Sequence, residues 1–317
     1  MHFTLMAVIL TIATHASAEC GNLCDNDYWQ TATMADLQAE LDAGADVMAR
    51  DKYGSTPLHY AASYSTFANI QTLLTSGVDV MARNNHGSTP LHSATRHPNT
   101  AENTQALLAG GADIMARDKN GSTPLHSAAW SGTPKSIQVL LGAGAGIMAR
   151  NVIGSTPLHS AVWHGGSTAN IQALLTAVAD VMALDSYGST PLHYAASYST
   201  PESIQMLLNA GADVMARSKD EKTPLHYAAA GGTPENIQAL LTAGADIMAR
   251  NIDGSTPLHL AAGSFFSNPG VIQALLSAGA DGKAKSTDGK NSWDTAQEND
   301  EIKGTKGYWA LNDAQYK

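Results

Sequence analysis

The stretch Asp51-Lys-Tyr-Gly-Ser-Thr-Pro-Leu-His-Tyr-Ala-Ala62 decides the fold, because its central tetrapeptide returns throughout the chain. Thr-Pro-Leu-His occurs seven times, at intervals of 33 or 34 residues. A period of this length is typical of a stack of small units in which each unit contacts only its neighbours. Such a stack offers a long surface to another molecule and has no obvious single pocket for chemistry. The tetrapeptide begins at Thr56, Thr89, Thr123, Thr156, Thr190, Thr223 and Thr256.

Each unit predicts two short helices. Thr56 is suited to the N-cap of the first helix, and Pro57 to its first position, where a missing N–H costs nothing. Apolar residues then follow at helical spacing from Leu58, and again from Ile70 after a short turn. Gly77 supplies the left-handed residue that commonly ends a helix. A unit with one apolar stripe per helix cannot bury those stripes alone, so the units must stack.

These residues resemble the ankyrin repeat: Asp-x-x-Gly-x-Thr-Pro-Leu-His-x-Ala-Ala, followed by Leu-Leu-x-x-Gly-Ala-Asp-Val. The resemblance covers about residues 27–300. It implies an all-α repeat solenoid, an ankyrin stack of helix-turn-helix units with β-hairpin fingers that project at about right angles. The inner helices and the fingers would together form a concave surface for a partner.

The repeat period also divides the chain into segments. We expect a signal peptide over residues 1–18, an N-terminal segment with a capping half-repeat over 19–50, seven ankyrin repeats over 51–285, and a C-terminal cap and tail over 286–317. Terminal units with altered outer faces keep such a stack soluble. The repeats are expected at 51–83, 84–117, 118–150, 151–184, 185–217, 218–250 and 251–285.

Several copies depart from the pattern. The longer ones carry their extra residues between the two helices, at 97–99, 165–167 and 265–267, where a connecting turn tolerates added length. Val178 replaces the helix-ending glycine of the fourth repeat, and Glu221 replaces the turn glycine of the sixth. Because a positive φ would strain either residue by about 1–3 kcal/mol, we expect the backbone to relax there and the stack to bend or open.

The N-terminus predicts export. Residues 5–13 form an apolar run too short to cross a bilayer, and Ala16-Ser17-Ala18 fits a signal-peptidase site, so cleavage is expected after Ala18. The mature chain would then be periplasmic or secreted; a merely hydrophobic N-terminus is the alternative. Cys20 and Cys24, the only cysteines, would form a small disulfide loop in an oxidising compartment, or remain two free thiols in a frayed tail.

Composition narrows the class of partner. The chain has a formal net charge of −10 and a pI near 5.5. This acidic balance weighs against nucleic acid and anionic membrane, which both reward excess Lys and Arg. No Gly-rich phosphate loop, carboxylate pair or Cys/His cluster stands out, so no cofactor, metal or catalysis is expected. We expect a monomer, with no membrane insertion of the mature chain, whose partner is another protein.

The seven histidines of the tetrapeptide are expected to be structural. Equivalent atoms in stacked helix pairs lie about 10 Å apart, whereas zinc ligands lie about 2 Å from one shared ion. The histidines therefore cannot share a metal site. The resemblance implies that each of them links two turns through hydrogen bonds. They are His59, His92, His126, His159, His193, His226 and His259.

A column of methionines departs from the ankyrin pattern, which usually has Asn at this position to satisfy backbone groups of the loop. A thioether is not expected to do that. We expect the methionines to pack on one another between the fingers; a soft apolar stripe for an adaptable partner is the alternative. Because oxidation would weaken either arrangement, a protective or mechanical envelope role tied to oxidative stress is a second functional hypothesis. The column is Met48, Met81, Met115, Met148, Met182, Met215 and Met248.

A column of arginines runs beside the methionines. Each arginine precedes a turn that often begins with Asp, so solvated pairing with that carboxylate is expected. A role in partner binding is the alternative. The column is Arg50, Arg83, Arg117, Arg150, Arg217 and Arg250.

The candidate partner-binding residues follow from the resemblance. Ankyrin repeats usually contact partners through the residues that flank the turn glycine and through the pair after Ala-Ala of the first helix. Aromatic residues fill many of these positions, and Trp, Tyr and Arg dominate interface hot spots. Aromatic side chains that merely cover neighbouring backbone are the alternative. The candidates are Tyr53, Tyr64, Arg96, Arg117, Trp130, Arg150, Trp163, His164, Tyr187 and Tyr198, with Trp130 and Trp163 at the centre.

The leading hypothesis is therefore an exported ankyrin-repeat scaffold that binds a protein through its concave face. An enzyme or small-ligand binder is the less favoured class. That class requires one repeat with a polar constellation that the others lack, and the sequence reveals none.

Overall fold

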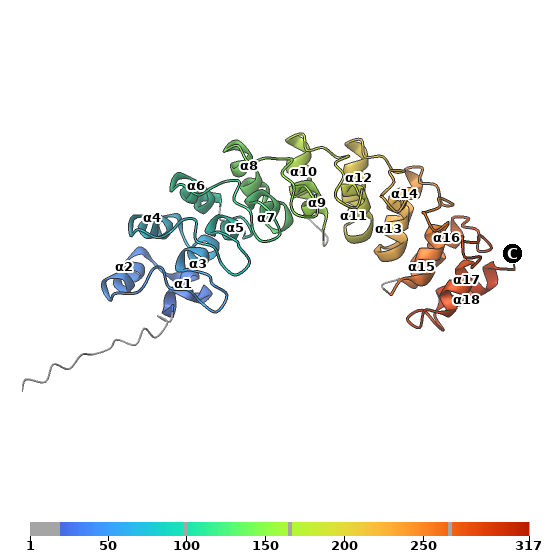
Figure 1. The fold of residues 1–317 in the computed structure, drawn as a ribbon, viewed down its shortest axis with the longest axis horizontal. Coiled ribbons are helices and arrows are strands. Elements are labelled where there is room, and N and C mark those ends of the chain that lie inside the picture. The colour runs from blue at the N-terminus through green and yellow to red at the C-terminus, as the bar shows by residue number, and fades with distance from the viewer. Residues whose placement is uncertain (1–19, 98–100, 164–166, 266–267, 317) are drawn as a thin grey trace, which may run out of the picture.

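Helix pairs stack in a single curved array in the computed structural model, which describes residues 20–97, 101–163, 167–265 and 268–316. The first helix of each pair lies in the inner row of the arc and the second helix in the outer row (Figure 1). Helices α1 (Asn26–Thr31) and α18 (Lys306–Ala314) lie at opposite ends of the arc. The prediction of an all-α repeat solenoid is confirmed.

Each expected repeat from residue 51 to residue 285 contains one inner and one outer helix. The inner helices are α3 (Pro57–Tyr64), α5 (Pro90–Ala94), α7 (Pro124–Ser131), α9 (Pro157–Val162), α11 (Pro191–Tyr198), α13 (Pro224–Gly231) and α15 (Pro257–Gly263). The outer helices are α4 (Phe67–Thr75), α6 (Ala101–Ala109), α8 (Pro134–Gly142), α10 (Thr168–Thr176), α12 (Pro201–Asn209), α14 (Pro234–Thr242) and α16 (Pro269–Ser277).

The three insertions fall between an inner and an outer helix, as predicted, because each inner helix ends before the added residues and each outer helix begins after them. Residues 98–100, 164–166 and 266–267 of these connections lie outside the described residues. Every helix in the part of the chain that the structure describes is too short or too polar to span a bilayer.

Both ends of the stack are helix pairs. The N-terminal pair was expected to be a half-repeat, but Trp29 of its first helix is buried and donates its Nε1–H to the Leu23 carbonyl at 2.8 Å. At the other end the expected tail folds into an outer helix that packs beside α16. The elements are η1 (Gly21–Cys24), α1 (Asn26–Thr31) and α2 (Met34–Asp42), and α17 (Ser292–Gln297) and α18 (Lys306–Ala314).

The histidine of each tetrapeptide links its own helix to the next repeat. His59 Nδ1 accepts from the Thr56 N–H at 3.1 Å, and His59 Nε2 donates to the Ser88 carbonyl at 3.0 Å. The other six histidines repeat this pair of bonds. The structural role predicted for these histidines is confirmed.

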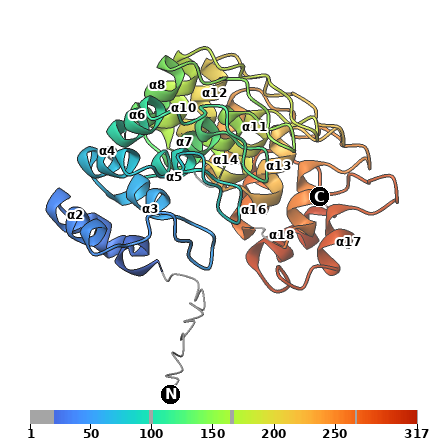
Figure 2. The same ribbon diagram turned by 60° about the vertical axis from the view of Figure 1, so that its left-hand side comes forward.

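The fingers are hydrogen-bonded turns that project from one side of the stack (Figure 2). One backbone bond joins each finger to the next, as where the Asn85 N–H donates to the Tyr53 carbonyl at 2.8 Å. The described residues contain no β-strand, so the expectation of β-hairpin fingers is wrong. A single bond per junction is too few to build a strand ladder.

The methionine column hydrogen-bonds the next repeat. Six of its sulfurs lie 3.2 to 3.4 Å from a backbone nitrogen of the following finger, whose N–H they accept. The expectation that a thioether cannot satisfy loop backbone groups is therefore wrong. A thioether sulfur is a weak acceptor, but the long methionine side chain carries it across to the next finger. The six are Met48, Met81, Met115, Met182, Met215 and Met248.

The arginine column also joins successive fingers. Each guanidinium donates to the backbone carbonyl of the equivalent residue in the next repeat, as from Arg50 to Arg83 at 2.7 Å and from Arg217 to Arg250 at 2.9 Å. The expected pairing with Asp is wrong, because those carboxylates accept backbone N–H groups of their own turns. Within the described residues only Arg217 has a carboxylate nearby, that of Glu221 at 3.6 Å.

Val178 and Glu221 both keep the left-handed backbone, with φ of 63° and 56°. The expectation that the chain relaxes at these residues is wrong. After α10, the Val178 N–H donates to the Leu175 carbonyl and the Ala179 N–H to the Leu174 carbonyl, both at 3.0 Å. This pair of bonds ends a helix only when the intervening residue has positive φ. The stack imposes the conformation although the residue is not glycine.

The apolar core is interrupted after the second repeat. One cluster of buried side chains lies within residues 23–112 and another within residues 125–311. Thr95 stands where the other six repeats have Ala or Val, and Thr104 where they have Ile; both are fully buried. The Thr95 hydroxyl donates to the carbonyls of His92 and Pro124. Polar atoms at two core positions of one repeat thus separate the clusters.

Candidate functional site

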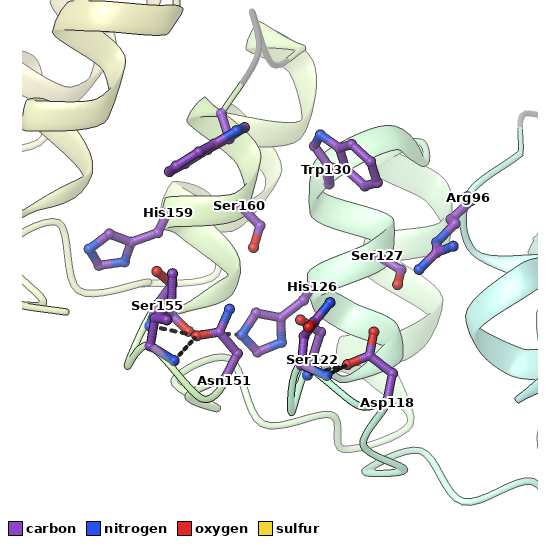
Figure 3. A pocket seen from close by; sticks show the side chains of 13 residues that line it. Arg96, Asp118, Ser122, His126, Ser127, Trp130, Asn151, Ser155, His159 and Ser160 are labelled. Carbon is purple, nitrogen blue, oxygen red and sulfur yellow. Dashed lines mark hydrogen bonds between the residues drawn. The ribbon is translucent and has the colours of Figure 1, made fainter. Parts of the chain in front are cut away.

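A cavity of about 330 Å³ opens between α7 and α9, on the side of the stack formed by the inner helices and the fingers (Figure 3). The Trp130 indole lies at one end of the cavity, and the turn residues Asp118 and Asn151 lie at the other. Trp163 also lines it, and Arg96 reaches it from the second repeat. The cavity therefore draws on three consecutive repeats.

The cavity exists because two side chains are small. Ser127 of α7 and Ser160 of α9 line it, each directly after the histidine of its tetrapeptide. A tyrosine at this position fills the equivalent space in other repeats, where its ring packs against the histidine of the preceding repeat. The position is Tyr60, Tyr194 and Tyr227 in three repeats, Ser93, Ser127 and Ser160 in three, and Leu260 in the last.

The Asp118 carboxylate presents one oxygen to the cavity. Its Oδ1 accepts from the N–H groups of Asn120 at 2.9 Å and Ser122 at 2.8 Å, which holds the side chain in place. No group of the described residues donates to Oδ2. Since the carboxylate lines the cavity, this oxygen is available to a hydrogen-bond donor from outside.

The equivalent oxygen is occupied in two other repeats. Tyr60 donates its hydroxyl to Asp51 Oδ2 at 2.6 Å, and Tyr194 donates to Asp185 Oδ2 at 2.5 Å. Burial and this hydrogen bond to the carboxylate raise the pKa of both tyrosine hydroxyls, so they remain protonated donors. Asp118 has the same turn geometry and the same spacing of nine residues, but Ser127 stands in place of the tyrosine.

Arg96 lies near the cavity with its hydrogen-bonding capacity unused. Its guanidinium makes no hydrogen bond to the described residues and no ion pair within 4.0 Å, and its Nε is buried without an acceptor. Burial lowers the pKa of Arg96, an effect that the charge of Asp118 partly opposes. A buried Nε–H with no acceptor favours a ligand that brings one.

Two of the predicted binding residues have different surroundings. Trp130 is 48% exposed at the edge of the cavity. Trp163 packs against Tyr194 and Tyr198 of the next repeat, with its ring centroid 4.9 and 5.2 Å from theirs. The alternative reading, in which an aromatic side chain covers its neighbours, therefore applies to Trp163 and Tyr198 more than to Trp130.

The remaining candidates do not line the cavity. Tyr53 and Tyr187 are exposed on the fingers, and Tyr64 packs against the His97 ring. Arg117 and Arg150 donate to carbonyls of the following repeats, as described above. His164 lies outside the described residues. Only Arg96, Trp130 and Trp163 are brought together at one place.

The polar end of the site was not predicted from the sequence. No repeat was expected to have a polar constellation of its own, yet Asp118 with Ser127 is such a combination. The signal was present in the spacing, since Asp is followed nine residues later by Tyr in two repeats and by Ser in one. Without the bond from Tyr60 to Asp51, nothing indicated that these two positions touch.

Cys20 and Cys24 lie at either end of the first helical turn, with their Cα atoms 5.3 Å apart, a separation that suits a disulfide. No group of three or more His, Cys, Asp or Glu side chains within the described residues is placed to hold a metal ion.

Comparison with known proteins identifies the family of the chain. The family model of ankyrin repeats (three copies) matches it in five overlapping segments, at residues 30–118, 69–151, 99–185, 125–218 and 212–286. The chain therefore belongs to the ankyrin repeat family. The crystal structure of the human ASB11 ankyrin repeat domain is similar to it, with a TM-score of 0.60 and 31% sequence identity over 70% of this chain and 97% of that chain. A search of curated proteins finds no match.

Proposed function

We propose that this ankyrin-repeat protein binds another protein through its concave face, with the cavity between α7 and α9 at the centre of the contact. Ankyrin repeats are generally scaffolds that mediate interaction with other proteins, and typically not enzymes. The observation that carries the proposal is Trp130, a large aromatic side chain left half exposed beside a cavity on the inner side of the stack. Such a side chain is a typical hot spot.

Charge and size complete the proposal. With a formal net charge of −10 the chain would be steered toward a basic or neutral protein surface and away from nucleic acid. The long curved face offers room for a partner to contact several repeats at once. The protein would act as a monomer, because each end of the stack is closed by its own helix pair.

Export is a separate proposal. The predicted leader, residues 1–18, lies outside the described residues, and the proposal rests on its apolar run and small residues. The mature protein would begin at Glu19 in the periplasm or outside the cell. Mass determination of the protein from its native compartment tests this, since an uncleaved N-terminus would contradict it.

The test of the binding proposal compares two tryptophans. The purified full chain, immobilised, is exposed to an extract of the native compartment, and the captured proteins are identified by mass spectrometry. Trp130→Ala should abolish capture of the specific partner, because it removes the exposed ring at the cavity. Trp309→Ala is the matched control, since Trp309 is 56% exposed but lies on α18 at the end of the stack.

Equal capture by the Trp130→Ala variant and the wild type would overturn the site assignment. Helicity measured by circular dichroism should be the same in all three proteins. Trp163→Ala is less suitable as a test, because Trp163 supports Tyr194 and Tyr198 and its loss would disturb the stack.

A further inference from the structure

We propose that the cavity binds a tyrosine side chain of the partner protein, whose hydroxyl donates to Asp118 Oδ2 above Ser127. This inference rests on the proposed function, since it names the group that the partner inserts. It is carried by the chain itself, because two other repeats contain the complete arrangement and this repeat contains all of it except the ring.

The internal tyrosines show what the cavity would accept. In the first repeat the Tyr60 ring rises from α3 and its hydroxyl donates to Asp51 Oδ2 at 2.6 Å. In the fifth, Tyr194 of α11 does the same to Asp185 at 2.5 Å. Asp118 is held by the same two turn bonds that hold those carboxylates. A tyrosine from outside would complete the third copy.

The volume and the walls fit an aromatic ring. A cavity of about 150 Å³ is enough to hold benzene, and this one measures about 330 Å³. Trp163 shows how a tryptophan at this position receives a ring in the next repeat, since its centroid lies 4.9 Å from that of Tyr194. Trp130 is the equivalent residue one repeat earlier, and the ring it would receive stands over Ser160, where the turn residue is Asn151. This is a second position of the cavity, next to the position over Ser127 that Asp118 and Arg96 line. The remaining volume beside Trp130 would hold a residue that neighbours the inserted tyrosine.

Arg96 indicates that the tyrosine belongs to a polypeptide. Its guanidinium lines the cavity next to Asp118 and lacks an acceptor within the described residues. The tyrosine hydroxyl would donate to the Asp118 carboxylate. The Arg96 guanidinium would then donate to a main-chain carbonyl beside the tyrosine. A free phenol would bring no such carbonyl.

The first experiment measures discrimination between two probes. The full chain is titrated with N-acetyl-L-tyrosinamide and with N-acetyl-L-phenylalaninamide, and the indole N–H signals of Trp130 and Trp163 are followed by NMR. We expect the tyrosine amide to bind at least about tenfold more tightly, because a hydrogen bond to a charged acceptor discriminates by about this factor. Equal affinity for the two amides would overturn the proposal.

Asp118→Asn removes the acceptor and keeps the turn. Asn151 occupies the equivalent position of the fourth repeat and its Oδ1 accepts the same two backbone N–H groups, so the variant is expected to fold. The preference for the tyrosine amide should then disappear. Asp51→Asn is the matched control, because Tyr60 already fills that site, and the preference should persist there. An unchanged preference in Asp118→Asn would overturn the proposal.

Ser127→Tyr supplies the missing ring from within the chain. Its hydroxyl is expected to reach Asp118 as Tyr60 reaches Asp51, so the variant should fold and should bind neither amide. Undiminished binding of the tyrosine amide by this variant would contradict the assigned position.

The source of the phenol is tested with p-cresol, which lacks the main chain. Arg96→Met should weaken binding of N-acetyl-L-tyrosinamide severalfold and leave binding of p-cresol unchanged. If p-cresol bound to the wild-type chain as tightly as the amide, the ligand would be a free phenol. The proposal that a partner protein supplies the tyrosine would then be wrong. The two proposals can fail separately. If Trp130→Ala lost the captured partner but the wild-type chain bound both amides equally, the protein-binding proposal would stand and the insertion of a tyrosine would be overturned.

Discussion

Each histidine of the Thr-Pro-Leu-His tetrapeptide is held in one tautomer by its two backbone partners, beside the hydroxyl of its threonine. In His226, Nδ1 faces the Thr223 N–H, which can only donate, and Nε2 faces the Ser255 carbonyl, which can only accept. The proton is therefore on Nε2, and the ring is neutral. A second proton on Nδ1 would oppose the Thr223 N–H, so the bond that caps the helix within the repeat requires an uncharged imidazole, whereas the Nε2 bond to the next repeat does not.

Stability should consequently fall in mild acid. Burial lowers the pKa of His92, His193 and His226 to about 4, against about 6.5 in the unfolded chain. Between pH 6.5 and pH 4 the unfolded state binds more protons than the folded state. The contribution of these histidines to stability is therefore complete above pH 6.5 and is lost as the pH falls toward 4. Each of the three should lower the free energy of unfolding by about 1.4 kcal/mol per pH unit.

Urea unfolding at about pH 7 and about pH 5 measures this effect. The control is His226→Gln, in which the loss between the two pH values should be smaller by the share of one histidine, whatever its stability at neutral pH. An unfolding free energy that does not change between the two conditions would show that the histidines take up protons in the folded chain as they do in the unfolded chain.

At the scale of single elements, helix ends and fingers are set by the stack more than by local preference. Val178 is β-branched and exposed, and such a residue rarely takes positive φ. It does so here because two helix-ending hydrogen bonds and the following finger require that geometry. Equivalent glycines take the same conformation after the other outer helices, with φ of 84° at Gly77 and 94° at Gly211.

Val178→Gly is therefore expected to stabilise the protein. Glycine relieves the strain of the left-handed backbone but gives the unfolded chain more backbone entropy. The difference should raise the free energy of unfolding by about 1 kcal/mol. Thermal unfolding followed by circular dichroism measures it. Ala177→Gly is the matched control, because Ala177 has a φ of −83° and glycine there relieves no strain. A lower melting temperature for Val178→Gly would contradict this account.

The whole molecule is one arc with two separate cores. A stack unfolds as a sum of units and interfaces, so a weak interface can divide it into independent parts. Thr95 and Thr104 place polar atoms in the interior of the second repeat, at the boundary between the two buried clusters. We expect the part within residues 23–112 to open separately from the part within residues 125–311.

Hydrogen exchange followed by mass spectrometry tests this division, since the two parts should show different opening free energies. Thr104→Ile restores the residue of the other six repeats and should raise the opening free energy of the N-terminal part by about 1 kcal/mol. Thr176→Ile, at an exposed position of α10, is the control and should change neither part. Uniform exchange across both parts of the wild-type chain would refute the division.

Much of this architecture was predictable from the sequence alone. Helix starts, the histidine links and the place of the insertions all depend on residues a few positions apart within one unit, and seven copies state the same pattern. The roles of the arginine and methionine columns were not predictable in this way. Their partners are backbone groups of the next repeat. Every residue has such groups, so the sequence does not indicate which of them will be bound.

The sequence by itself determined the period, the paired helices and the stacked form, because each unit carries apolar stripes that only a neighbour can bury. The tertiary structure alone decided where the stack is open. The cavity depends on what Ser127 and Ser160 leave unfilled between neighbouring repeats, and on the carboxylate of Asp118 that faces it. Space between packed units is a property of their contact, which no single unit specifies.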